Sequence, residues 1–325
     1  MGKAVPPTSD EINLSGKTVV VTGGNSGLGW EFARQSLILN ASRVIITTRS
    51  ESKGNAALAS LRADPEVKSR NPHAQLEFFD LDLDDYESGL HFTRRIKEQV
   101  PDLDILLCNG GTNLMHYETS KSGHERVMQV NCYTHFLVVL SLLPLLKATA
   151  ARRGSPSRVT FMSSYSHTRH TLEKIPIAMK ESVLEHYDDR SKFRGLARYQ
   201  DSKLVLNAFV YQLSTMVSPS EIIVNSVCPG IVATNLNHNL PCWIKPLIYV
   251  LYRIKGRTLC EGGRLSIHAA VVAGKDSHGK FLQDGHVNSG APFLSQPAGK
   301  QYMEKLWWEI VGDAINVNPE IETLA

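Results

Sequence analysis

Short runs of apolar, β-branched residues alternate along the chain with longer segments in which apolar residues recur at helical spacing. The predicted strands are Thr18–Thr22, Arg43–Thr48, Gln75–Phe79, Ile105–Cys108, Val159–Met162, Ile222–Val227 and Lys280–Leu282. The clearest predicted helices are Leu28–Leu39, Lys53–Ala63, Tyr86–Gln99, Gly123–Ala150 and Tyr199–Met216. Alternating strands and helices are typical of parallel sheets with helical cover. The pattern predicts an α/β fold, with one doubly wound parallel sheet of about seven strands and helices on both faces.

The alternation extends over most of the chain, which favours one domain. Residues 1–14 are polar and contain prolines, so they are predicted to form a flexible N-terminal tail. The predicted domain covers 15–325, with 287–325 as a C-terminal extension. The stretches 166–198 and 235–257 also lack the alternation.

Composition limits the class of partner. Hydrophobic residues make up 42% of the 325 residues, which is enough for a large core and excludes a disordered chain. The 35 basic residues nearly balance the 32 acidic ones, so we expect no nucleic-acid partner. The longest apolar run, Phe136–Leu146, falls well short of the about 20 residues that cross a bilayer. We therefore expect no transmembrane segment.

The cysteines indicate a reducing compartment. They are Cys108, Cys132, Cys228, Cys242 and Cys260, and none forms a C-x-x-C pair. The N-terminus has no apolar signal segment. Reduced thiols, no metal site and a cytoplasmic location are expected.

A glycine-rich turn directly follows the first predicted strand and leads into a helix. Its spacing is G-x-x-x-G-x-G. Glycine lets backbone amides approach a pyrophosphate closely, and the helix N-terminus adds partial positive charge. The turn therefore predicts a dinucleotide site, although an ordinary tight turn is the alternative. The predicted contacts are Gly23, Asn25, Ser26, Gly27, Leu28 and Gly29.

The end of the second predicted strand indicates which dinucleotide to expect. An acidic residue there would bind the ribose 2′-hydroxyl of NAD, but the sequence has Thr48 and Arg49. A guanidinium matches a 2′-phosphate in charge and shape, and Lys53 adds a second positive charge. NADP(H) is therefore the predicted cofactor. Glu51 weakens this argument slightly, and a solvated loop arginine is the alternative.

Tyr199 and Lys203 are four positions apart, so they share one face of a helix. An ammonium close to a phenol stabilises the phenolate and is expected to lower the pKa of Tyr199. The tyrosine could then exchange a proton with a substrate oxygen near neutral pH. Ordinary surface pairs show the same spacing, so this motif is informative only together with others.

Six motifs occur along the chain in a fixed order. They are the glycine turn, Cys108–Gly111, Asn131, Ser163–Ser164, the pair Tyr199 and Lys203, and Pro229–Thr234. With them the chain resembles the short-chain dehydrogenase/reductase superfamily. The segment Arg198–Leu204 looks most like the retinol-dehydrogenase-like branch and its fungal relatives. The resemblance covers about 14–285 and implies a single Rossmann-type domain.

The resemblance also implies a role for each motif residue. Tyr199 would be the general acid, Lys203 would lower its pKa and bind the nicotinamide ribose, and Ser164 would hydrogen-bond the substrate carbonyl. Asn131 would hold a water molecule that links Lys203 to solvent. The implied cofactor contacts further include Asp82, Leu83, Asn109, Gly110, Gly111, Asn131, Tyr199, Lys203, Pro229, Gly230, Val232 and Thr234.

Two regions depart from the family pattern or vary within it. Ser164 and Tyr199 are unusually far apart, so 172–198 form an insertion that is either a specificity element or a surface loop. Residues 235–257 occupy the place of the family's substrate lid. Their apolar part, 241–254, could instead contact a membrane surface or pack in the core.

The resemblance implies an NADPH-dependent reductase that converts a ketone or aldehyde of a small lipophilic molecule to an alcohol, in secondary-metabolite biosynthesis. A homodimer is also expected. Two alternatives remain: the same residues could oxidise an alcohol, or the chain could be a non-catalytic NADP-sensing protein. The presence of Asn131, Ser164, Tyr199 and Lys203 weighs against a sensor, because a sensor needs no proton relay.

Overall fold

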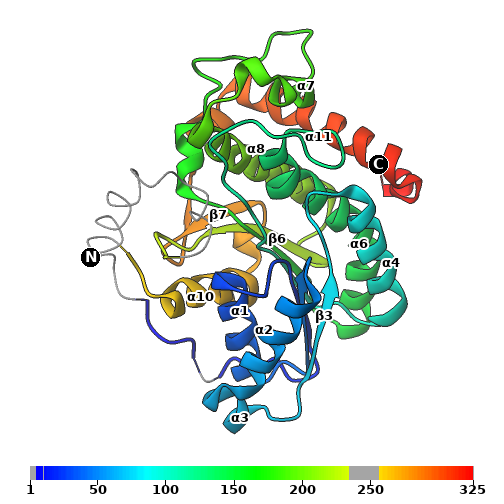
Figure 1. Cartoon of the computed structure of the whole chain (residues 1–325), viewed down its shortest axis with the longest axis vertical. Helices are drawn as coiled ribbons and strands as arrows, with labels where there is room; N and C mark the ends of the chain where they lie inside the picture. Colours follow the sequence, from blue (N-terminus) through cyan, green and yellow to red (C-terminus); the bar gives the residue numbers. More distant parts are fainter. Residues whose placement is uncertain (1–4, 10, 234–255, 325) are drawn as a thin grey trace.

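The computed structural model of the chain describes residues 5–9, 11–233 and 256–324. Its centre is an eight-stranded sheet in the order β3-β2-β1-β4-β5-β6-β7-β8 (Figure 1). All neighbouring strands are parallel except β7 and β8, which are antiparallel. The strands are β1 Thr18–Val21, β2 Arg43–Thr48, β3 Gln75–Asp80, β4 Ile105–Cys108, β5 Ser157–Met162, β6 Ile222–Cys228, β7 Lys280–Gln283 and β8 His286–Asn288. The strand order reverses between β1 and β4, where a doubly wound sheet opens a crevice beyond its carboxyl ends.

The seven predicted strands are confirmed, and β8 is an eighth strand that was not predicted. β8 pairs with β7 across the turn Asp284-Gly285, in which both residues have positive φ angles of 55° and 80°. An Asp-Gly pair between two strands is a strong hairpin signal. The sequence therefore contained evidence for β8, and the missed signal is this turn.

Helices cover both faces of the sheet, as predicted. Because successive strand residues point to opposite faces, Val20 shares a core cluster with α4, α6, α8 and α11, whereas Val19 and Val21 share one with α1, α2 and α10 (Figure 1). The helices are α1 Gly27–Ile38, α2 Glu51–Ala63, α3 Pro65–Arg70, α4 Tyr86–Gln99, α5 Arg126–Met128, α6 Thr134–Arg153, α7 Val183–Asp188, α8 Gly195–Met216, α10 Leu259–Ile267 and α11 Pro297–Val317.

The predicted helix at 123–150 is a continuous helical segment from Arg126 to Arg153. A π-helical turn, η1 Gln129–Tyr133, separates α5 from α6 within it. Among the described residues, this is the one segment long and apolar enough to cross a membrane, but most of its apolar window is buried inside the protein. Burial against the sheet explains its apolar composition, so we describe it as a core helix.

The insertion 172–198 is not a superficial loop. Val183 and Tyr187 on α7 are fully buried, and the Tyr187 hydroxyl lies 3.0 Å from the hydroxyl of Tyr302 on α11. In Figure 1, α7 and α11 lie together above α8. The insertion and the C-terminal extension therefore form one layer over the helix that carries Tyr199 and Lys203.

The predicted tail and lid have different outcomes. Val5 and Ile12 pack against the core cluster that includes α1, while flexibility of 1–14 remains a prediction. Of the predicted lid, 235–257, only Gly256 and Arg257 are among the described residues. Thr234 and Cys242 also lie outside them.

Candidate active site

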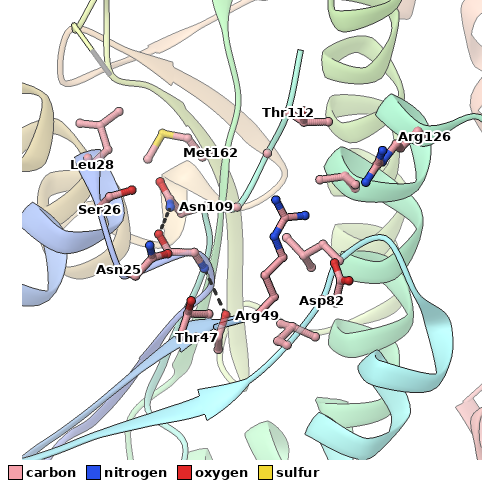
Figure 2. A pocket seen from close by; sticks show the side chains of 18 of the residues that line it. Asn25, Ser26, Leu28, Thr47, Arg49, Asp82, Asn109, Thr112, Arg126 and Met162 are labelled. Carbon is pink, nitrogen blue, oxygen red and sulfur yellow. Dashed lines mark hydrogen bonds between the residues drawn. The ribbon is translucent and has the colours of Figure 1, made fainter. Parts of the chain in front are cut away.

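A cleft of about 960 Å³ lies at the carboxyl ends of the central strands (Figure 2). It is where a doubly wound sheet binds ligands. Fourteen of the residues singled out from the sequence line it. They are Gly23, Asn25, Ser26, Gly27, Leu28, Arg49, Lys53, Asp82, Leu83, Asn109, Gly110, Gly111, Tyr199 and Lys203.

The glycine turn forms one wall of the cleft and is held from behind by Asn109. The side-chain amide of Asn109 donates to the carbonyl oxygens of Thr22 and Gly23, at 2.9 and 3.3 Å. Thr22 Oγ1 also accepts hydrogen bonds from the backbone amides of Asn109 and Gly110. Ser26 precedes α1 without capping it through its side chain. The helix end can therefore offer backbone amides to an anion, as a pyrophosphate requires.

Gly29 packs too closely for any side chain. A Cβ there would lie 2.5 Å from Asn109 Nδ2 and 2.6 Å from the Gly23 carbonyl oxygen. Gly29→Ala is therefore expected to displace the turn and to weaken NADPH and NADH binding alike, by about tenfold or more (about 1.4 kcal/mol). Fluorescence titration with both dinucleotides measures this loss.

Gly312→Ala is the matched control for Gly29→Ala. Gly312 is exposed on α11, and a Cβ there would meet no atom within 4 Å. This variant is expected to keep both dinucleotide affinities and to gain about 1 kcal/mol of stability from helix propensity. Unchanged affinity in Gly29→Ala would contradict the close packing of the turn.

Arg49 follows β2 and enters the cleft. Figure 2 shows its side chain reaching between Asn109 on one side and Asp82 and Arg126 on the other. Asp82 accepts a hydrogen bond from Lys121 at 2.8 Å. Burial acts to raise the pKa of Asp82. The hydrogen bonds from the Lys121 ammonium and from the backbone amide of Asp84, together with the charge of Arg49, outweigh burial and lower the pKa. The Asp82 carboxylate, on which the charge of Arg49 acts, is thus itself paired with a lysine.

Tyr199, Lys203 and Ser164 come together from α8 and the end of β5. The Ser164 side chain lies close enough to the Tyr199 hydroxyl to favour its ionised form. Lys203 is buried, with Nζ donating to the Met162 carbonyl oxygen at 2.8 Å and lying 5.5 Å from the centre of the Tyr199 ring. Three predicted catalytic groups are therefore neighbours.

The two serines of the Ser163–Ser164 motif have different surroundings. Ser163 is buried, and its hydroxyl accepts from Asn207 at 2.9 Å inside the core. Ser164 is half-buried and contacts Tyr199. The second serine is thus the one beside Tyr199, and its role toward a substrate stays a prediction.

The expected lowering of the Tyr199 pKa is wrong for the protein as described. Burial raises the pKa of Tyr199, the nearby Cys228 acts in the same direction, and the hydrogen bond from Ser164 compensates only in part. Burial also lowers the pKa of Lys203 to about 8. The spacing of the two residues was informative, whereas the dielectric surroundings that set their pKa values depend on the whole fold.

Asn131 lies in the π turn η1, and its side chain is fully engaged. Its Oδ1 accepts the Thr112 amide at 2.7 Å, and its Nδ2 donates to the Thr112 carbonyl at 3.1 Å and to Ser202 Oγ at 2.9 Å. The side chain therefore ties the strand-end loop to α8. π turns are frequent at functional sites, and holding a water molecule stays a prediction for this residue.

The residues after β6 lie beside the cleft rather than in its described lining. A Cβ at Gly262 would meet Leu28, Val232 and Pro229, so these side chains surround one point. Gly230 has a φ of 82° and packs against Arg257. Since Leu28 lines the cleft, this segment adjoins the predicted site without forming its wall.

Comparison with known proteins identifies the family. Residues 17–173 match the family model described as short chain dehydrogenase. The short chain dehydrogenase sor7 of Hypocrea jecorina is 53% identical over 87% of this chain and 79% of its own length. The chain belongs to the short-chain dehydrogenase family.

Further matches agree with this family. The short-chain dehydrogenase/reductase tropG of Talaromyces stipitatus is 39% identical over 94% of this chain and 93% of its own. The Pseudomonas aeruginosa protein RhlG, solved as an NADP complex, has a TM-score of 0.62 at 21% identity, over 85% of this chain and 97% of its own. The Rossmann-type fold is confirmed, and the protein is an oxidoreductase of alcohol and carbonyl groups.

The dehydrogenase motifs did not reveal every residue of the cleft. Its opposite wall comes from the loop after β4, from α5 and from η1. Arg126 is fixed there by an ion pair with Glu118 and a 3.0 Å hydrogen bond to Asp84. The residues of this wall are Thr112, Leu114, His116, Glu118, Arg126 and Val130. Their spacing along the chain follows no motif, so nothing in the sequence marked them.

No metal site accompanies the cleft in the described part of the chain. Across 5–9, 11–233 and 256–324, no group of three or more His, Cys, Asp or Glu side chains is arranged to hold a metal ion. Cys108, Cys132 and Cys228 are free and buried, and Cys260 is free and partly buried.

Proposed function

We propose that the protein is an NADP(H)-dependent reductase that converts the ketone or aldehyde group of a lipophilic small molecule to an alcohol. The observation that carries the cofactor choice is Arg49, which reaches into the cleft from the end of β2, where no carboxylate stands. A guanidinium there would bind a 2′-phosphate through paired hydrogen bonds and charge. The NADP complex of the structurally similar RhlG is consistent with this choice.

The residues present fit the family's chemistry. The bound reduced dinucleotide would supply a hydride to the carbonyl carbon. Ser164 and Tyr199 would hold the carbonyl oxygen between two hydroxyl donors, and Tyr199 would donate its proton as that oxygen gains negative charge. Burial keeps the Tyr199 phenol protonated, which is the form that reduction consumes. The ammonium of Lys203 would then stabilise the phenolate.

The lipophilic substrate class is supported by apolar side chains around these groups. Leu114, Val130 and Met162 line the cleft. The likeness to the fungal dehydrogenases sor7 and tropG supports a part in secondary-metabolite biosynthesis. The proposal includes a cytoplasmic, homodimeric enzyme.

Arg49→Ala tests the cofactor choice. Wild type is expected to bind NADPH at least about tenfold more tightly than NADH, a difference of about 1.4 kcal/mol, and the variant is expected to lose this preference by weakening NADPH alone. Fluorescence titration of both dinucleotides measures the two dissociation constants.

Arg94→Ala is the control, because Arg94 is exposed on α4 and does not line the cleft. It should leave both dissociation constants unchanged. Equal binding of the two dinucleotides by wild type, or a preference for NADH, would contradict the proposed NADP dependence and favour an alcohol-oxidising enzyme.

A further inference from the structure

His167 is a buried residue that joins two distant parts of the chain. It lies three positions after Ser164, in the short helix η2 Tyr165–Arg169, and is fully buried. Its Nδ1 lies 2.6 Å from the backbone carbonyl oxygen of Ser164. Its Nε2 lies 2.9 Å from the backbone nitrogen of Ala291, which is 124 positions away in the C-terminal extension.

The chemistry of these two partners determines where the ring carries its proton. A backbone amide only donates, so Nε2 accepts from Ala291 and carries no proton. A carbonyl oxygen only accepts, so Nδ1 carries the proton and donates to Ser164. The ring is therefore neutral and in the Nδ1–H tautomer. Burial lowers the pKa of His167, in agreement with a neutral ring.

The surroundings hold the ring in this orientation. The Phe281 ring of β7 packs against it edge to face, with 4.6 Å between ring centres. A Cβ at Gly290 would come within 2.7 Å of Nε2, and the φ of Gly290 is 68°, in the region that favours glycine. The imidazole is therefore packed closely against both the sheet and the C-terminal extension.

We propose that His167 is a positioning residue, which fastens the backbone of Ser164 to the C-terminal extension and so sets where the Ser164 hydroxyl meets Tyr199 and the substrate oxygen. The inference rests on the proposed function, because it concerns the work of Ser164 in that reaction. Both ring nitrogens are already engaged, so His167 is not a second proton donor to the substrate. The C-terminal extension thereby becomes part of the active site.

Two variants separate the two hydrogen bonds. In His167→Asn, the amide nitrogen can take the place of Nδ1 toward Ser164; in His167→Gln, the amide oxygen can take the place of Nε2 toward Ala291. Each variant loses one anchor, and each is expected to lower kcat about 10- to 100-fold, because small displacements of a reacting group cost this much. The dissociation constant for NADPH should stay within about twofold, because neither anchor touches the cofactor turn.

His170→Gln is the matched control. His170 lies in the same stretch and is almost as buried, but its Nδ1 has no hydrogen-bond partner among the described residues. Its kcat is expected to stay within about twofold of wild type, since no anchor of Ser164 is lost. A loss equal to that of His167→Gln would overturn the specific role of His167.

A double-mutant cycle with Ser164→Ala distinguishes positioning from general packing. If His167 acts through the Ser164 hydroxyl, His167→Gln lowers kcat far less in the Ser164→Ala background than in wild type. His167→Asn should also keep more activity than His167→Leu, because the asparagine amide can still donate to the Ser164 carbonyl oxygen and leucine cannot. Equal losses in both backgrounds, or a kcat of His167→Gln close to that of wild type, would overturn the proposal.

Nitrogen NMR of wild-type protein with isotope-labelled histidine measures the protonation of the His167 ring directly. This measurement needs neither turnover nor a variant, so it tests the proposal even if the variants fail to fold. At pH 7 the His167 ring is expected to have a proton on Nδ1 and none on Nε2. An imidazolium or an Nε2–H ring in an active enzyme would overturn the positioning role alone. The expected tautomer in a protein that turns over no carbonyl or alcohol would overturn the proposed function, and the positioning role with it.

Discussion

Tyr199→Phe is expected to lower kcat for carbonyl reduction by about 10³-fold, because general acid catalysis typically contributes 10²- to 10⁴-fold. Tyr199 is the phenol next to Ser164, and its ring lies 5.5 Å from the ammonium of Lys203. Phenylalanine keeps the ring and its packing but removes the proton that the alkoxide oxygen must receive. Steady-state kinetics on the best carbonyl substrate, with NADPH titration alongside, measures the loss of turnover separately from binding.

Tyr211→Phe is the matched control for this prediction. Tyr211 lies on the same helix and is 42% exposed, so its hydroxyl is available to solvent and removing it should leave kcat unchanged. Retention of NADPH binding with loss of turnover in Tyr199→Phe would support catalysis. Turnover unaffected by Tyr199→Phe would remove Tyr199 from the reaction, and a wild type that turns over no carbonyl would favour an NADP-sensing protein.

Lys203→Met is expected to abolish most activity and yet to stabilise the free protein at neutral pH by about 2 kcal/mol. Burial lowers the pKa of Lys203 from 10.5 to about 8. Holding the ammonium protonated at pH 7 therefore costs about 3 kcal/mol, at 1.36 kcal/mol for each pH unit. Loss of the hydrogen bond to the Met162 carbonyl offsets about 1 kcal/mol of the gain. Urea unfolding measures the difference in free energy of unfolding.

The pH dependence of this difference has a definite sign. The unfolded chain keeps the Lys203 proton up to pH 10.5, whereas the folded protein releases it near pH 8. Between these values the unfolded state binds more protons, so the stability of wild type rises with pH. The advantage of Lys203→Met should thus be full below pH 8, should vanish between about pH 9 and 10, and should reverse to a deficit of about 1 kcal/mol near pH 10.5, where wild type has regained the whole cost of the ammonium.

Lys300→Met is the control for Lys203→Met, because Lys300 is exposed on α11. It should change stability little at any pH. A Lys203→Met protein that is less stable than wild type at pH 7, or whose advantage does not shrink toward alkaline pH, would contradict the buried ammonium.

The pattern of the sequence was sufficient where local physics decides the structure. The strand β2 was predicted because a continuous run of β-branched residues is typical of a strand buried on both faces of a parallel sheet. β2 is paired on both sides and is buried over most of its length. The glycine turn was predicted because its backbone demands glycine at close approaches, as at Gly29. Tyr199 and Lys203 share a helix face because residues four positions apart do so in any α-helix, whatever the tertiary fold.

Elsewhere, the sequence indicated residues but not their surroundings. The insertion 172–198 carried no periodic signal, because its short helix α7 is stabilised by contacts with α11, more than a hundred positions later. The opposite wall of the cleft, with Arg126 and Glu118, was missed for the same reason. Such residues become neighbours only when separate elements pack.

By itself, then, the sequence determined the parallel sheet and the motif residues that line much of the cleft. Only the tertiary structure decided that the pKa of Tyr199 is raised, and that His167 connects Ser164 to Ala291. The physical reason is common to both. Strand and turn preferences act between residues close in sequence, whereas burial and the partners of a buried side chain depend on segments that are distant along the chain.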